Sequence, residues 1–319
     1  MNGAVPKLPL EKATVLNPVS KNILRTLLYF DIFKHPLRKE EIFHCSCEPL
    51  VTLSMVEDEL NFLLSQNILV LSKGFYLFEN NQHHVMRRLS GETAAQKALK
   101  TAYRFSKLIS MFPFVRGVCI SGSLSKGYMD RETDIDYFII TATGRLWLSR
   151  SLLVLFKKLF LLNSRKYFCV NYFVDEENLR IPDKNFFTAT ELAFIVPAYN
   201  YELYARLIER NNWMKKYYPL FPLREKNGVL TVKKPMLKRF LEFVFNGALG
   251  EKLDSFFFKL TLNHWKRKFS YFDESTFDLR IRSRKNVSKH HPKGFQDKIL
   301  TAWEEKLDTF EIQHGIDLR

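Results

Sequence analysis

One segment of the chain joins two apolar runs through a glycine-serine turn and a pair of aspartates. The first run, Val118 to Ile120, leads into Gly122-Ser123, and the second follows Asp134-Ile135-Asp136 and extends to Ile140. Short apolar runs bounded by turn residues predict buried strands. We therefore expect two neighbouring strands here, with polar side chains gathered where the chain turns between them.

The residues after the first run suit a phosphate group. Gly122 admits close approach of the backbone, and the following residues can open a helix whose free N–H groups would receive phosphate oxygens. Lys126 adds a positive charge beside them. The predicted nucleotide-binding residues are therefore Gly122, Ser123, Ser125 and Lys126. The competing interpretation is an ordinary strand-to-helix turn at Gly122-Ser123.

Two aspartates introduce the second run. Asp134 and Asp136 are two residues apart, so on a strand both side chains leave the same face while Ile135 points into the core. Two converging carboxylates would hold Mg²⁺, which completes its coordination with water and substrate phosphate. We therefore predict Asp134 and Asp136 as metal ligands. The alternative is that Thr133 and Asp134 merely cap the entry to a strand.

Together these motifs resemble the DNA polymerase β-like nucleotidyltransferase superfamily, whose pattern is Gly-Ser followed roughly ten residues later by Asp-x-Asp on the neighbouring strand. Gly122-Ser123 and Asp134-x-Asp136 meet that pattern, which covers only about Val115 to Val174. The resemblance implies an α+β fold with a mixed sheet flanked by helices. It also implies a Mg²⁺ cofactor and transfer of a nucleoside monophosphate.

The third strand departs from this pattern. Members of the superfamily usually supply a third carboxylate from a later strand, but Asn171 is the only strongly polar residue in the next candidate, Tyr167 to Val174. An amide can lend an oxygen to a cation but cannot act as a general base at neutral pH. Asn171 is therefore a candidate catalytic residue or an amide tied to backbone. Two interpretations of the acids that follow, Asp175 to Glu177, remain open: they replace the missing third carboxylate, or they form a solvated turn.

The N-terminal part, residues 1–81, has the pattern of a winged-helix domain. Apolar residues from Ile23 to Phe33 form a helical stripe, a short second helix follows Pro36, and Ser54-x-x-Glu57 predicts a capping box for a third helix. Two apolar runs around Ser72-Lys73-Gly74 predict a hairpin. The third helix carries acids and no Lys or Arg, so we expect packing or protein docking and not duplex DNA binding.

The rest of the chain divides at residue 185. Residues 82–185 form the predicted nucleotidyltransferase domain, which includes a connecting helix over Thr93–Phe112 and a crossover helix over Arg145–Asn163 that would join two parallel strands. Residues 186–319 are predicted to be a helical C-terminal domain with helices at Ala189–Arg210, Met236–Phe269 and Gln296–Phe310. The stripe of Phe240, Phe243, Val244, Phe256, Phe257 and Leu260 favours core packing over a membrane-surface face.

The formal charge of +15 suggests polyanionic partners. The stretch from Arg280 to Lys293 contains no acid, so it is a candidate contact for a nucleic acid or protein acceptor, or else a solvated loop. No segment has the length and apolarity of a membrane span, and Met1 to Pro9 does not look like a signal peptide. The four cysteines agree with a reducing compartment, and His44-Cys45-Ser46-Cys47 lacks a second zinc-ligand pair. We expect a cytoplasmic protein.

Two functions remain open from the sequence. The first is a Mg²⁺-dependent nucleotidyltransferase that moves a nucleoside monophosphate, with AMP preferred, from a nucleoside triphosphate to a hydroxyl acceptor. The second is a catalytically silent protein of the same fold that binds nucleic acid or a protein partner. The whole chain resembles bacterial nucleotidyltransferase-domain proteins with an N-terminal winged helix.

Overall fold

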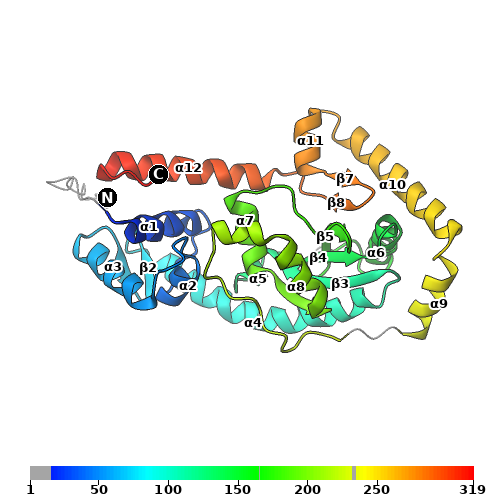
Figure 1. Ribbon diagram of the computed structural model, residues 1–319, viewed down its shortest axis with the longest axis horizontal. Helices are drawn as coiled ribbons and strands as arrows, with labels where there is room; N and C mark the ends of the chain where they lie inside the picture. The colour runs from blue at the N-terminus through cyan, green and yellow to red at the C-terminus, as the bar shows by residue number, and fades with distance from the viewer. Residues whose placement is uncertain (1–15, 165, 232–234) are drawn as a thin grey trace. The chain divides into compact units, whose positions relative to one another are not determined.

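The computed structural model describes residues 16–164, 166–231 and 235–319 (Figure 1). The first fifteen residues of the predicted 1–81 domain lie outside this part of the chain. They include the segment Met1 to Pro9, in which we expected no signal peptide. The chain forms two compact units. We call them the helical unit, made of the chain up to Leu89 with Met214–Pro222 and Gln296–Arg319, and the sheet unit, made of Ser90–Trp213 and Leu223–Phe295.

The helical unit begins with three helices and a hairpin: α1 (Pro18–Asp31), α2 (Lys39–His44), α3 (Leu53–Ser65), β1 (Val70–Ser72) and β2 (Phe75–Leu77). The hairpin is antiparallel, and Lys73 and Gly74 turn the chain with positive φ angles, as the sequence predicts. The predicted capping box at Ser54 is wrong. The side chain of Thr52 caps α3 by accepting a hydrogen bond from Met55 N, so the helix begins at Leu53.

The C-terminal helix α12 (Phe295–His314) completes the core of the helical unit. The ring of Trp303 packs edge-on against Tyr29 of α1, and Phe310 packs against Phe78. The indole of Trp303 also donates to Arg25 O. The last residues of the chain therefore pack with its first helices, whereas the sequence suggested that they belong to a separate domain spanning residues 186–319.

A six-stranded sheet forms the centre of the second unit. Its strands are β3 (Val115–Ser121), β4 (Asp136–Thr141), β5 (Cys169–Asp175), β6 (Val196–Tyr199), β7 (Ser283–Arg284) and β8 (Val287–Lys289), in the order β6-β3-β4-β5-β8-β7. Only β4 and β5 pair in parallel, and α6 (Leu146–Phe160) connects them. This crossover was expected from its length, and the chain has an α+β fold with a mixed sheet, as predicted.

The two faces of this sheet differ. Alternate residues such as Val118, Ile120 and Ile139 lie on one face, in a single buried core with Ala102 of α4 (Gln82–Ser110) and Trp147 of α6. The other face carries Ser121 and Asp136, which pair across β3 and β4. Helix α8 (Tyr201–Arg210) packs against β3 and β6. The second face is also largely buried, with Cys119, Phe138 and Ile140 along it, and its polar side chains Ser121 and Asp136 lie where β3 ends and β4 begins.

Several predicted helices differ from the observed ones. The helix expected over Ala189–Arg210 is α7 (Phe186–Phe194), edge strand β6 and α8, because Ile195 leaves the helical conformation and Pro197 suits an edge strand. The helix expected over Met236–Phe269 is interrupted at 245–247, giving α9 (Met236–Val244) and α10 (Ala248–Lys268). The connecting helix begins at Gln82, earlier than the predicted Thr93.

Three shorter elements remain. They are α5 (Gly122–Ser125), the 3-10 helix η1 (Asn212–Lys216) and α11 (Glu274–Arg280). Within the described ranges, no helix is both long enough and apolar enough to cross a bilayer.

Candidate functional site

The glycine-serine turn lies directly against the second aspartate. Ser121 at the end of β3 pairs with Asp136 at the start of β4, and Gly122 then adopts φ +68° as α5 begins. A Cβ atom on Gly122 would stand 2.5 Å from Asp136 Oδ2. Glycine is therefore required both for the backbone angle and for the space that the carboxylate occupies. The structure brings the two motifs together at one sheet edge, as the sequence predicts.

Asp136 lies between β3 and β5 and has neutral hydrogen-bond partners. It pairs in register with Cys169, the first residue of β5, and its Oδ1 accepts a 3.0 Å hydrogen bond from Asn171 Nδ2. Burial raises the pKa of Asp136 to about 6. The hydrogen bonds from Cys169 and Asn171 oppose that rise, and the negative charges of Glu191 and Asp134 add to it. Asp136 is thus a largely shielded but partly exposed carboxylate with two further acids, Glu191 and Asp134, close enough to raise its pKa.

Asp134 precedes the strand instead of lying on it, because β4 begins at Asp136. The burial alternation that we predicted is present: Ile135 is fully buried, whereas Asp134 and Asp136 are partly exposed. Backbone hydrogen bonds link Ile135 to Lys166 and Cys169 and hold this segment extended beside β5. The two aspartates therefore sit on the same side of the chain and interact electrostatically.

Asn171 occupies a β-bulge. Val170 pairs with Tyr137 and Tyr172 pairs with Phe138, so Asn171 is the extra residue in β5. Its backbone carbonyl oxygen accepts a hydrogen bond from His290 N at 3.0 Å. Its side chain turns toward Asp136 and Cys169. The bulge explains how a polar residue in an apolar strand reaches the aspartate. The side-chain amide of Asn171 is therefore bonded to the side chains of Asp136 and Cys169 and not tied to backbone, and its catalytic role stays a prediction.

The predicted phosphate-binding residues are partly engaged with the protein itself. Ser125 is buried and its hydroxyl donates to Gly122 O at 2.8 Å, which closes the short α5 turn. Lys126 Nζ lies 2.7 Å from Glu191 Oε1 of α7 and also reaches Gly122 O at 3.3 Å. The Ser123 hydroxyl has no protein partner within the described part of the chain. The turn thus offers one hydroxyl and one paired lysine.

Sequence reasoning missed Glu191. It is the single acid in the otherwise apolar or neutral helix Phe186–Phe194, and its charge reaches Asp136 while its side chain holds Lys126. A lone carboxylate in an apolar helix needs a partner, which is the signal that could have identified it. Glu191 supplies a third negative charge from a helix, whereas we had looked for one on β5.

The acids that follow β5 lie at the other end of the sheet. Asp175 pairs with Thr141, which is five residues along β4 from Asp136, or about 16 Å. Asp175 Oδ1 accepts hydrogen bonds from Glu177 N and Asn178 N and so closes the turn after the strand. The interpretation of these acids as a turn therefore fits the structure, and their use as the third carboxylate does not.

The basic segment Arg280–Lys293 is a hairpin of the sheet, not an open loop. Arg282 and Lys289 are buried, and both form ion pairs with Asp183, at 2.9 and 3.1 Å. Burial opposes ionisation of Asp183, but these two cations hold its pKa below the ordinary value. Burial also lowers the pKa of His291 to about 4, so this histidine is neutral at pH 7. Two cations of the expected basic segment, Arg282 and Lys289, are therefore paired inside the protein.

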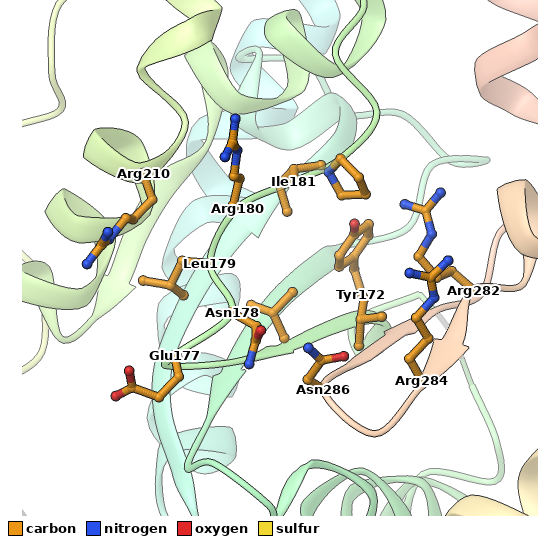
Figure 2. A pocket seen from close by; sticks show the side chains of 13 residues that line it. Tyr172, Glu177, Asn178, Leu179, Arg180, Ile181, Arg210, Arg282, Arg284 and Asn286 are labelled. Carbon is orange, nitrogen blue, oxygen red and sulfur yellow. The ribbon is translucent and has the colours of Figure 1, made fainter.

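A pocket of about 370 Å³ adjoins this hairpin (Figure 2). Four arginines line it, namely Arg180, Arg210, Arg282 and Arg284, with Glu177 as the one acid in its lining. Tyr172 and Val174 form part of its wall, and they pair with Phe138 and Ile140, which share a face with Asp136. The Tyr172 ring stacks on Phe138 at 4.9 Å. The pocket therefore lies on the Asp136 face of the sheet, farther along β5.

Across residues 16–164, 166–231 and 235–319, no three His, Cys, Asp or Glu side chains cluster as a ready-made metal site. The pair Asp134 and Asp136 offers fewer ligands than a closed protein cage. Mg²⁺, however, commonly binds through one or two carboxylates and takes its remaining ligands from water and substrate phosphates.

Comparison with known proteins adds no assignment: no family model, curated protein or solved structure matches this chain.

Proposed function

We propose that this protein is a Mg²⁺-dependent nucleotidyltransferase that transfers a nucleoside monophosphate, AMP in our preferred version, from a nucleoside triphosphate to a hydroxyl acceptor. The observation that carries the proposal is the placement of Asp136: a largely shielded carboxylate, against a glycine with a positive φ angle, with its pKa raised to about 6. A carboxylate held beside two other acids favours a cation as its missing partner.

The residues at this edge fit a magnesium ion. Asp134 and Asp136 would hold it, and Asn171 would orient Asp136 through its hydrogen bond. Mg²⁺ supplies charge that polarises the transferred phosphorus and stabilises the departing pyrophosphate. Gly122 and Ser123 would receive the β and γ phosphates through backbone N–H and hydroxyl.

Lys126 and Glu191 have linked roles in this proposal. Their 2.7 Å ion pair keeps Lys126 beside the turn while no phosphate is present. A triphosphate would compete with Glu191 for Lys126, since both are anionic acceptors for one ammonium group. Lys126 would then contact phosphate, and Glu191 would be free to accept a proton from the acceptor hydroxyl. Asn171 cannot take that role, because an amide is not a base at neutral pH.

The arginine-lined pocket supports an anionic acceptor. It shares the sheet face of Asp136, and three of its arginines, Arg180, Arg210 and Arg284, are exposed. Guanidinium groups bind phosphate and carboxylate oxygens in paired hydrogen bonds. In this proposal, the nucleic acid or protein acceptor expected at the basic segment would contact the pocket and not all of Arg280–Lys293.

A second candidate function is a catalytically silent protein of the same proposed nucleotidyltransferase and winged-helix arrangement. The observations that favour it are Asn171 in place of a carboxylate and the engagement of Lys126 with Glu191. In this version the protein binds nucleotide or nucleic acid and regulates a partner. Replacement of Asn171 by aspartate separates the two: a general base is worth roughly 10²- to 10⁴-fold in rate, so an active but attenuated enzyme would gain visibly.

Calorimetry with ATP, GTP, CTP and UTP, each with and without Mg²⁺, tests the proposal. We expect at least one nucleotide to bind only with the metal, and Asp136→Asn to abolish that binding while the protein stays folded. Glu177→Gln is the matched control, because Glu177 lines the arginine pocket away from the turn. Absence of metal-dependent binding by all four nucleotides would overturn the proposal.

A further inference from the structure

Helix α9 is amphipathic, but it packs against the protein through its polar face and not through its apolar face. Two of its three charged side chains face the protein, and the first of them, Lys238, is 1% exposed and donates to Ser110 O and Val115 O, both at 2.7 Å. One turn later, Glu242 accepts from Phe114 N and pairs with Arg116 at 2.6 Å. The polar face of the helix is therefore the one that anchors it to the sheet unit.

The apolar face of the same helix points to solvent. Phe243 is 83% exposed, Phe240 62% and Leu237 69%. The sequence had favoured core packing for a stripe that includes Phe240 and Phe243. That prediction is right for Phe257, which packs against the core, and wrong for the exposed residues Phe240, Phe243, Val244, Phe256 and Leu260. In α9 the reason is that Lys238 and Glu242 find buried partners, so the opposite face of the helix turns outward.

Helix α10 continues the pattern. Leu249, Phe256 and Leu260 are each more than half exposed and follow one another at helical spacing. The opposite side of α10 anchors the helix: Asp254 accepts from Leu148 N, and Trp265 packs against Trp147. We call the exposed apolar residues of both helices the α9–α10 surface.

The exposed charges around this surface are mainly positive. Between residues 235 and 269, six basic side chains are exposed and one acid, Glu251, is exposed with them. The basic residues are Arg239, Lys252, Lys259, Lys266, Arg267 and Lys268. A second copy of the chain would bring like charges together, which disfavours self-association through this surface. Aromatic and aliphatic residues with flanking lysines and arginines are typical of helices that lie on an anionic bilayer.

We propose that the α9–α10 surface is a peripheral binding site for an anionic phospholipid membrane. The apolar residues, Phe240 and Phe243 foremost, enter the boundary between headgroups and acyl chains, and the basic residues contact lipid phosphates. Binding requires both contributions, since a single weak hydrophobic or electrostatic anchor gives only marginal attachment. The inference does not depend on the proposed nucleotide chemistry.

Flotation of the full-length protein with lipid vesicles tests this site. We expect the protein to float with vesicles of phosphatidylcholine containing about one third phosphatidylglycerol, to remain behind with phosphatidylcholine alone, and to be released as salt increases. The double variant Phe240→Ser, Phe243→Ser should weaken binding at least about tenfold. Leu50→Ser, at a residue that is 89% exposed in the helical unit, is the matched control and should bind as the parent does.

A charge variant tests the second contribution separately. Lys252→Glu with Lys259→Glu should abolish binding to anionic vesicles without lowering the melting temperature, because both side chains are exposed. The proposal is overturned if the parent protein fails to float with anionic vesicles. It is also overturned if sedimentation shows a dimer that the Phe240, Phe243 variant dissociates, because the occupant of the surface would then be a second copy.

Discussion

Asp136 and Asp183 are two shielded carboxylates of the same sheet unit with opposite surroundings. Asp183 has two cations, Arg282 and Lys289, and its pKa lies below the ordinary value. Asp136 has an amide, a thiol and two further acids near it, and its pKa is raised to about 6. Asp183 is therefore a satisfied structural charge, whereas no ion pair to Asp136 is formed by the residues that the structure describes. The difference marks Asp136 as the place where a ligand cation has most to contribute.

The largest effect on the free energy of unfolding should come from breaking an ion pair of Asp183. Arg282→Met leaves Asp183 with one cation fewer in a shielded position, and removal of one partner of a buried pair costs about 3–5 kcal/mol of unfolding free energy. Arg284→Met is the control, because Arg284 is exposed and its pair with Asp278 is worth less than about 1 kcal/mol. Chemical denaturation measures both. Equal effects of the two substitutions would contradict the contrast.

At Asp136 we expect a substitution to change the free energy of unfolding in the opposite direction. Folding raises its pKa from 3.8 to about 6, so the unfolded chain loses the proton first as pH rises. The free energy of unfolding should therefore fall between about pH 4 and pH 6 and stay level above that range. Asp136→Asn removes this penalty and should stabilise the metal-free protein by roughly 1–3 kcal/mol at pH 7, with no gain at pH 4. Thermal unfolding at the two pH values checks this, and destabilisation at pH 7 would refute it.

A comparison of Gly122 with Gly127 distinguishes two effects on stability, backbone strain and crowding of the Asp136 carboxylate. Gly122 and Gly127 both have positive φ angles, but only at Gly122 would a Cβ atom meet Asp136. Alanine at either position should cost about 1–2 kcal/mol of stability through its backbone conformation. Gly122→Ala should cost about 1 kcal/mol more and should also weaken nucleotide binding. If Gly127→Ala impairs binding equally, the close approach of Gly122 to Asp136 is not what matters.

The smallest effect concerns Glu191. Its charge contributes to the raised pKa of Asp136, so Glu191→Gln should lower that pKa by a fraction of a unit. The pH at which Mg²⁺-nucleotide binding reaches half its maximum should shift down with it. Glu176→Gln, beyond the far end of β5, should leave that pH unchanged. A shift of the same size in both variants would show a general charge effect.

The sequence predicted the inner part of the sheet unit better than its margins. Strands β3 to β5 and the crossover helix were found because long apolar runs and paired motifs are strong local signals. Strands β6 to β8 were missed: they are short, one contains Pro197, and β7–β8 has the composition of a basic loop. They are strands because β6 pairs with β3, β8 pairs with β5, and β7 pairs with β8.

The site was predicted in the same uneven way. Asp136, Gly122 and Asn171 were found by spacing along the chain, and the structure brings them together. Glu191 was missed because its contribution comes from a helix about 55 residues after Asp136 in sequence, where no motif marks it. The outward face of α9 was also missed, since the helical pattern shows that a face is apolar but not which way it turns.

The central claim is that Asp136 lacks a counter-charge until a metal-bound nucleotide arrives. Selective ¹³C labelling of aspartate side chains allows the Asp136 pKa to be followed by NMR, with Asp136→Asn assigning the signal. We predict a pKa of about 6 in the free protein and a value below about 4 after addition of Mg²⁺ with the nucleoside triphosphate. An Asp136 pKa that is already low in the free protein, or one that Mg²⁺ and nucleotide leave unchanged, would contradict the account.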